Sequence, residues 1–198
     1  MKKVLATLLT ISVIFCVLGI PDSSCRASES EFSLIEYLET HDINSYSEFR
    51  EVIESNCPYS KTEDGIDSDD ITYFSIEIDY EDMTVSVTTM GDASLDRSQE
   101  ASNSASKTYY ASNGLPIFTI HVDGSFIYMA GSCNATSASG SFNRAALSTW
   151  TSNPTISSGN ITASKAYVRI YGIASSNGQS KSYTLTLTCD STGHFTSY

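Results

Sequence analysis

The sequence predicts a mainly β protein: a C-terminal, antiparallel, immunoglobulin-like β-sandwich over 107–198, preceded by a small acidic α+β segment over 28–90. Three observations predict this fold class. Runs rich in Val, Ile, Thr, Tyr and Phe recur after residue 106. Turn-forming pairs such as Asn113-Gly114 separate these runs at intervals of about ten residues, a spacing typical of antiparallel sandwiches. Amphipathic helical patterns fall in the acidic segment.

Residues 1–27 are predicted to be a secretory signal peptide. Lys2 and Lys3 precede an apolar, uncharged run over 4–20, and Ala27 follows with the small residues that a signal peptidase recognises. A membrane anchor is one alternative, although a run of about 17 residues is short for a membrane span. A lipoprotein is another, although the polar residues before Cys25 fit it poorly. We therefore expect a secreted, extracellular protein without a membrane span after signal removal, with attachment to the cell surface as a further option.

Two short amphipathic helices are predicted at the start of the acidic segment. The first covers 30–40, where apolar residues recur at helical spacing. The second begins at Ser45 and Glu48, which form a capping-box pair, and ends at Cys57 before a proline. Helices this short cannot bury an apolar side alone, so we expect them to pack on each other or on a neighbouring sheet.

A hairpin and a linker are predicted to follow the helices. The hairpin strands lie at 72–78 and 83–90, with alternating apolar residues. Residues 91–106 are polar and lack apolar periodicity, which predicts an exposed linker. Charge supports a boundary here, because 28–100 holds 20 acidic and three basic residues and 101–198 holds two acidic and five basic residues.

The sandwich strands are expected to turn alternate side chains toward the core and toward solvent. Trp150, the one tryptophan of the chain, is predicted to be structural rather than a ligand platform. The predicted strands are 106–112, 116–123, 125–130, 145–150, 160–173, 182–189 and 194–198.

Three cysteines would remain after signal removal. Cys133 and Cys189 lie in β contexts of an exported protein, which predicts a disulfide between them. Such a bridge would contribute roughly 4 kcal/mol in the chain-entropy description; two unpaired buried thiols are the alternative. Cys57 is interpreted as a free thiol, a small apolar residue at a helix end, or a link to a second copy. The chain is therefore expected to be a monomer or a Cys57-linked dimer.

The order of motifs over 107–198 carries a resemblance to a known group of proteins. The matching stretches are 109–114, 118–128, 132–140, Trp150 and 184–193. This order resembles a group of small secreted proteins of Gram-positive, clostridia-type bacteria, which share a Ser/Thr-rich β-sandwich with one cysteine pair. The resemblance implies export, a sandwich and a cysteine pair. It implies no active site, and it does not cover the acidic segment.

No catalytic, metal or cofactor site is predicted. His121 and Asp123 lie on the same side of one predicted strand, but this spacing is typical of a polar strand face beside a turn. The chain has no Gly-x-Ser-x-Gly elbow and no paired histidines for zinc. A net charge of −12 makes it a poor nucleic-acid binder.

We therefore expect a non-enzymatic binding or interaction module whose partner is an extracellular protein or a carbohydrate. Aromatic side chains on a Ser/Thr-rich sheet suit such contacts because rings provide area at little cost in ordering entropy. Cross-strand pairing that stabilises the sheet is the alternative role for these rings. The charge division favours a second hypothesis, a precursor whose acidic segment is a pro-region and whose sandwich is a secreted, bacteriocin-like effector. The predicted binding face consists of Tyr109, Tyr167, Tyr171 and Tyr183.

Overall fold

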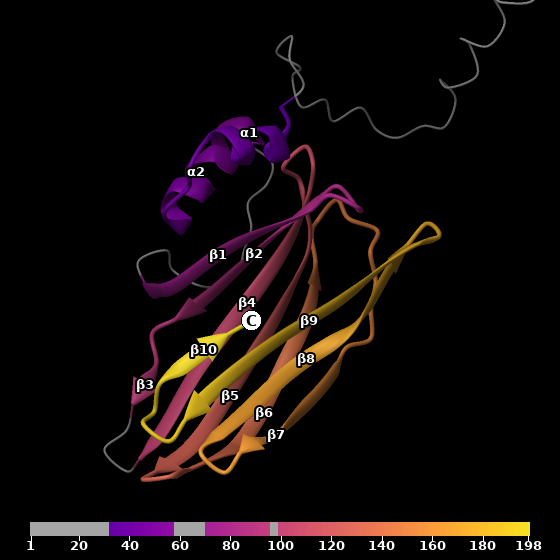
Figure 1. Cartoon of the computed structure of the whole chain (residues 1–198). Helices are drawn as coiled ribbons and strands as arrows, with labels where there is room; N and C mark the ends of the chain where they lie inside the picture. The colour runs from indigo at the N-terminus through magenta and orange to yellow at the C-terminus, as the bar shows by residue number, and fades with distance from the viewer. Residues whose placement is uncertain (1–31, 58–69, 96–98) are drawn as a thin grey trace, which may run out of the picture. The chain divides into compact units, whose positions relative to one another are not determined.

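The computed structural model describes residues 32–57, 70–95 and 99–198. The predicted signal peptide lies outside these residues. The described residues build two antiparallel β-sheets and two helices (Figure 1), which confirms the mainly β class. Residues Glu31–Tyr198 form one compact unit. Within the described ranges, no helix has the length and apolar character that a membrane span requires.

The two predicted helices are confirmed, and serine caps begin both. In α1 (Leu34–Thr40), the Ser33 side chain accepts a hydrogen bond from the Glu36 backbone N–H. In α2 (Tyr46–Asn56), Ser45 accepts from the Glu48 N–H at 3.2 Å. These caps satisfy N–H groups that the first helical turn leaves without partners.

The larger sheet runs in the order β1-β2-β4-β5-β6, and the short β3 pairs with β4. The predicted hairpin is therefore confirmed as β1 and β2, but it belongs to the same sheet as the strands that follow. The larger sheet contains β1 (Ile71–Asp79), β2 (Thr84–Gly91), β3 (Ser94–Leu95), β4 (Glu100–Ala111), β5 (Pro116–Met129) and β6 (Ser132–Arg144).

The prediction of a linker over 91–106 does not match the structure, because β3 and more than half of β4 lie there. β4 pairs with β2 on one side and β5 on the other, so it joins the acidic segment to the C-terminal strands. Ala101 and Ala105 face the core opposite Phe126 and Val122 of β5. Small residues fit this position because the neighbouring strand supplies the large side chains.

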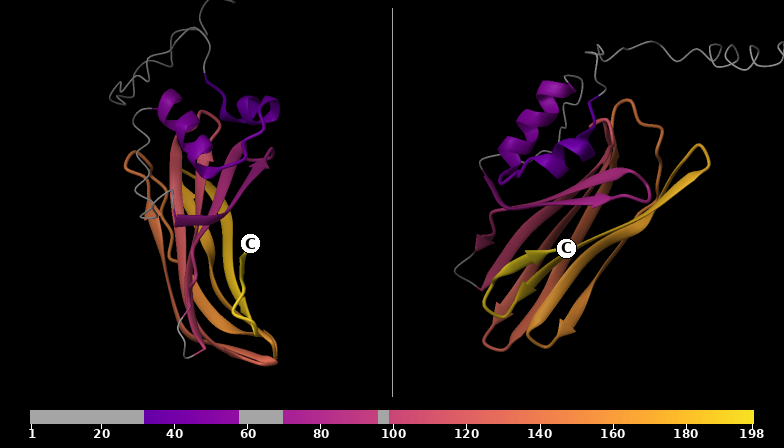
Figure 2. Two further views of the ribbon diagram at one scale, coloured as in Figure 1. Left: turned by 90° about the vertical axis from the view of Figure 1, so that its left-hand side faces the viewer. Right: turned by 45° about the horizontal axis from the view of Figure 1, so that its top comes forward.

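The smaller sheet lies against one face of the larger sheet (Figure 2) and runs in the order β10-β9-β8-β7. Alternate side chains of β8, such as Val168 and Ile170, enter the core between the sheets together with Leu185 and Leu187 of β9. The strands are β7 (Thr155–Thr162), β8 (Lys165–Ser176), β9 (Gln179–Asp190) and β10 (Phe195–Ser197).

The helices cover the opposite face of the larger sheet near β1 and β2 (Figure 2). Val85 and Val87 of β2 and Tyr110 of β4 form a second core with the apolar sides of both helices. The Phe49 ring of α2 meets the Tyr110 ring edge to face, with centroids 5.3 Å apart. The predicted need of the short helices for a packing surface is therefore met by this face of the sheet.

Three details of the predicted strand pattern are wrong. The expected turn at Asp123-Gly124 is absent because β5 continues through it. A Cβ atom at Gly124 would lie 2.7 Å from the Phe126 ring, so the glycine permits close packing rather than a turn. The run predicted as one strand over 160–173 is divided between β7 and β8. Residues 145–150 form a turn-containing segment instead of a strand.

Candidate functional site

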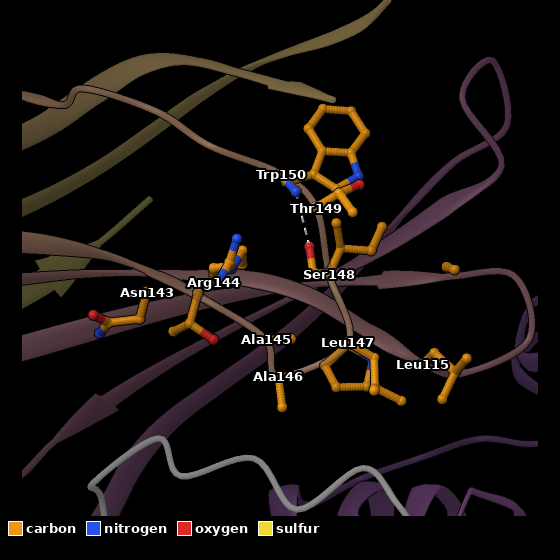
Figure 3. Close-up of a pocket in the computed structure, with 13 residues that line it drawn as sticks. Leu115, Asn143, Arg144, Ala145, Ala146, Leu147, Ser148, Thr149 and Trp150 are labelled. Carbon is orange, nitrogen blue, oxygen red and sulfur yellow. Dashed lines mark hydrogen bonds between the residues drawn. The ribbon is translucent and has the colours of Figure 1, made fainter. Parts of the chain in front are cut away.

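A cleft of about 670 Å³ opens between the start of β5, the end of β6 and the segment 145–150 (Figure 3). In the close-up, Asn143 and Arg144 stand on one side and Leu115 on the other, with Trp150 beyond Thr149. Larger apolar side chains and polar groups both contribute to the lining. The larger apolar members are Leu115, Pro116, Ile117, Leu147 and Trp150, and the polar members are Thr119, Asn143, Arg144, Ser148 and Thr149.

Hydrogen bonds hold the 145–150 segment in its conformation. The Ala145 N–H donates to the Ile117 carbonyl of β5 at 3.2 Å, and the Ser148 N–H closes a turn to the Ala145 carbonyl at 3.0 Å. The Ser148 hydroxyl then accepts from the Trp150 N–H at 3.2 Å (Figure 3). A serine side chain that bonds the backbone in this way competes with strand pairing, which explains why the predicted strand does not form.

The far end of this segment is tied to the smaller sheet. The backbones of Thr151 and Ser175 exchange two hydrogen bonds, of 3.0 and 2.9 Å. The hydroxyls of Thr149 and Ser176 share another at 2.5 Å. The segment is therefore attached to β5 at one end and β8 at the other, which fixes one wall of the cleft.

An aromatic cluster supports Trp150. Its ring centroid lies 5.9 Å from that of Phe118 in the core between the sheets. Phe118 also contacts Tyr109 at 4.5 Å, Phe142 at 4.9 Å and Tyr183 at 5.9 Å. Trp150 is thus partly buried against the core, as the structural prediction requires, while it also lines the cleft.

Arg144 gives the cleft its charge. Among the residues that the structure describes, no aspartate or glutamate lines the cleft. Over the described part of the chain, the recorded ion pairs involve Arg50, Lys107, His121 and Lys181, and none involves Arg144. The cleft therefore combines an apolar wall with one exposed guanidinium. Local sequence patterns do not reveal this site, because its residues come from separated stretches that are brought together by the β5–β6 pairing.

The four tyrosines predicted to form a binding face do not share a surface. Tyr109 and Tyr183 are 5 % and 3 % exposed and belong to the core between the sheets. The Tyr183 hydroxyl shares a hydrogen bond with the Ser152 hydroxyl at 2.7 Å. Tyr167 and Tyr171 lie on the outer face of β8, which leaves a much smaller exposed aromatic area than predicted.

Tyr167 is itself partly covered. Its ring lies next to Gly159 of β7, where an added Cβ would come within 3.3 Å of it. The Arg169 guanidinium sits 5.1 Å from the ring centroid, and its Nε donates to the Thr186 hydroxyl at 3.0 Å. Of the four predicted residues, Tyr171 alone is more than a third exposed, at 41 %.

The predicted disulfide between Cys133 and Cys189 is not present. Both residues are free, buried thiols. Cys133 lies on β6 and Cys189 on β9, in different sheets, and their sulfur atoms are not at disulfide distance. The side chains still interact, and burial together with this proximity raises the pKa of Cys189 to about 12. Burial also raises the pKa of Cys133.

Cys57 lies apart from this pair, at the end of α2. It is buried, and its thiol donates to the Asn113 carbonyl in the β4–β5 turn at 3.1 Å. This contact fits the interpretation of a small residue at a helix end. A link from this thiol to a second copy would require the helix end to move away from the turn.

Two lysines of the C-terminal strands bind the acidic hairpin. Lys107 donates to Glu77 at 2.7 Å. Lys181 of β9 donates to Asp79 and Asp82 at 2.9 Å each. The Lys107 hydrogen bond holds the pKa of Glu77 below its usual value, and the Lys181 hydrogen bond lowers the pKa of Asp79 in the same way.

The hollow beside these pairs, of about 460 Å³, is a less suitable ligand site than the cleft. Its lysines and carboxylates are matched to one another, so a charged ligand would have to displace an existing partner. Both lysine Nζ atoms also lie over the Tyr109 ring, at 5.9 and 5.8 Å from its centroid. These contacts indicate a structural junction between the acidic and basic halves of the chain.

His121 and Asp123 join a hydrogen-bonded row on the outer face of the larger sheet. The Ser106 hydroxyl lies 2.8 Å from His121 Nδ1, and His121 Nε2 lies 2.8 Å from an Asp123 oxygen. Ser139 donates to the other Asp123 oxygen at 3.1 Å. A serine, a histidine and an aspartate in series suggest a hydrolase triad. Ser106 is only 2 % exposed, however, and the strands around it use their N–H groups in sheet pairing, so this hydroxyl has neither substrate access nor an oxyanion hole.

Within the ranges that the structure describes, no three His, Cys, Asp or Glu side chains gather as a metal site would require. No family model, no curated protein and no solved structure matches the chain. The resemblance to secreted proteins of Gram-positive bacteria therefore stays a prediction.

Proposed function

We propose that this chain is a secreted, non-enzymatic binding module and that the cleft between β5, β6 and 145–150 is its ligand site. One observation carries the proposal: a concave site of about 670 Å³ combines an apolar wall with a few convergent polar groups. Sites for small molecules are commonly about 300–1,000 Å³ and have this mixed lining. We also propose that the two packed sheets form an immunoglobulin-like sandwich. Sandwiches of this type place ligand-binding loops at one end of the two sheets.

Pre-organisation of the cleft supports a binding role. Ala145, Ser148 and Trp150 are held by backbone hydrogen bonds, and the Trp150 ring rests on Phe118. A ligand that enters such a site does not have to pay for ordering the segment that receives it, which favours affinity. Leu147 is 72 % exposed, so a ligand with an apolar body would cover apolar surface that now faces water.

The surroundings of Ser106, the best candidate for a nucleophile, also favour a binding role over catalysis. Ser106 is covered, and the hydroxyl rows beside it pair across strands, as in the Thr108–Thr119 contact of 2.9 Å. Cross-strand hydroxyl pairs of this kind stabilise a sheet. We therefore assign the Ser106–His121–Asp123 row to the stability of the larger sheet rather than to catalysis.

The precursor hypothesis has less support than the binding module. Its released product would begin near β4, yet β2 pairs with β4 over seven residue pairs from Thr84↔Ala111 to Met90↔Ala105. Cleavage would also leave Lys181 without Asp79 and Asp82. Release of the C-terminal strands would therefore expose a long sheet edge, which favours aggregation.

The single tryptophan makes the proposal directly testable. Because Trp150 lines the cleft, a bound fluorophore should quench its emission by energy transfer. We would titrate the protein obtained from expression of the full chain with anilinonaphthalene sulfonate. Binding at one site is expected, with loss of Trp150 emission, and the variant Ala146→Phe should weaken it because the new ring fills the cleft.

The matched control is Ala163→Phe in the β7–β8 turn, which adds the same ring at an exposed position outside the cleft. This control should bind the dye as the natural protein does. Equal binding by the natural protein and Ala146→Phe would contradict the assignment of the cleft, as would dye binding that leaves Trp150 emission unchanged.

A further inference from the structure

We propose that the ligand of the cleft is an amphiphilic organic acid: an apolar body packs on Leu147 and Ile117, and its carboxylate pairs with Arg144. The inference rests on the proposed function, since it names the chemistry of the ligand in the same cleft. It is carried by the charge of the lining, by the engagement elsewhere of the two acids in this half of the chain, and by the position of the apolar wall.

The charge of the lining is positive and arises from one side chain. Arg144 is exposed at the end of β6, and within 32–57, 70–95 and 99–198 no carboxylate lines the cleft with it. The side-chain hydrogen bonds and ion pairs recorded for the described residues include none to Arg144, whereas Lys107 and Lys181 have short ion pairs elsewhere. A guanidinium presents a planar fork of donors that matches a carboxylate with two parallel hydrogen bonds.

The acids of the C-terminal half are engaged elsewhere. The only acidic residues in 101–198 are Asp123 and Asp190. Asp123 accepts from His121 and Ser139. Asp190 accepts from the Thr192 backbone at 2.8 Å within the β9–β10 turn. Neither aspartate lines the cleft, so a carboxylate supplied by a ligand would meet no repulsion from the acids of this half of the chain.

The apolar wall lies beside this charge rather than around it. Figure 3 shows Leu147 of the segment and Leu115 before β5 on the side away from Asn143, with Ala146 near Leu147. A ligand that satisfies both parts must therefore carry its charge at one end and its apolar body at the other. Such an arrangement suits an alkyl or cycloalkyl carboxylate. It does not suit a neutral sugar, which offers no charge, or a polyanion, which offers no apolar body.

The test compares octanoate with its neutral isostere octanamide, and Trp150 emission is the readout because neither compound absorbs with tryptophan. Octanoate is expected to bind the natural protein roughly tenfold more tightly than octanamide, as one charge-assisted hydrogen-bonded pair would allow. Arg144→Gln should remove this preference, because it should weaken octanoate binding far more than octanamide binding. Arg144→Lys should keep part of it, because the charge remains while the fork is lost.

Lys165→Gln is the matched control, since Lys165 lies outside the cleft and also forms no ion pair among those recorded for the described residues. It should bind both compounds as the natural protein does. Equal binding of octanoate and octanamide, or a preference that survives in Arg144→Gln, would overturn the inference while the cleft itself stays a ligand site. If neither octanoate nor octanamide binds although the dye does, the inference is wrong and the proposed function stands. If the dye also fails to bind at Trp150, both are wrong.

Discussion

Replacing Lys181 tests whether the acidic hairpin is an integral part of the fold. The Lys181 side chain is only 10 % exposed, and its Nζ donates to the half-exposed carboxylates of Asp79 and Asp82 at 2.9 Å each. The variant Lys181→Met keeps most of the aliphatic stem and removes the charge. An exposed ion pair contributes about 0.2–1 kcal/mol and a cation over an aromatic ring about 0.5–1 kcal/mol. Two ion pairs and the contact with the Tyr109 ring therefore predict a loss of about 1–3 kcal/mol in the free energy of unfolding.

Urea denaturation, followed by the emission of Trp150, measures this loss. The control Lys165→Met should change the free energy of unfolding by less than about 0.5 kcal/mol, as is usual for a surface substitution. A double-mutant cycle with Asp79→Asn should give a coupling energy of about 0.5–1 kcal/mol. A coupling energy indistinguishable from zero would show that the hairpin gains no stability from the Lys181–Asp79 ion pair.

The same pair predicts a dependence on pH. The hydrogen bond from Lys181 holds the pKa of Asp79 below its usual value. A lowered carboxyl pKa stabilises the folded state above the unfolded value of about 3.9, and this contribution is lost as pH falls through the folded pKa. The natural protein should therefore exceed Lys181→Met in stability at neutral pH, and the two should converge in strong acid. A constant difference across this range would contradict the assignment.

Two further predictions concern a turn and the thiols. Gly114→Ala should lower the free energy of unfolding by about 1–3 kcal/mol, because Gly114 has φ +80° and an added Cβ would lie 3.1 Å from the Phe32 ring and 3.3 Å from Cys57 Sγ. Urea denaturation measures this change. An unchanged free energy of unfolding would show that the turn relaxes to accept the Cβ atom. Cys133 and Cys189 should resist iodoacetamide in the native protein and react after unfolding without a reductant, because burial keeps them as thiols. Peptide mass mapping identifies the cysteines that have reacted. A cysteine peptide that reacts only after reduction would show that the predicted disulfide exists.

Local patterns predicted the helices and the hairpin well. Ser45 and Glu48 marked the start of α2, and the alternation of 72–78 and 83–90 marked β1 and β2. These elements are visible in the sequence because capping and amphipathic periodicity depend on neighbouring residues. Small, polar strands were not visible, because β4 begins with serines and alanines whose apolar partners come from β5.

The candidate site was harder to predict because it depends on register and on loop hydrogen bonds. The alternation around Tyr167 and Tyr171 predicted that they share a strand face, but it did not show that Tyr109 and Tyr183 point into the core. The Ser148 hydrogen bond that shapes 145–150 is equally hidden, since this stretch also fits a short strand. Trp150 was correctly expected to pack on the core; its second role in the cleft follows only from the position of that segment.

The cleft as ligand site is tested most directly by nuclear magnetic resonance of the ¹⁵N-labelled protein during titration with octanoate. If octanoate binds in the cleft, the amides whose shifts change first lie in 111–119 and 143–150, around Arg144 and Trp150. Shifts that centre instead on the outer face of β8, around Tyr167 and Tyr171, would place the binding surface on the tyrosines and contradict the assignment of the cleft as the ligand site.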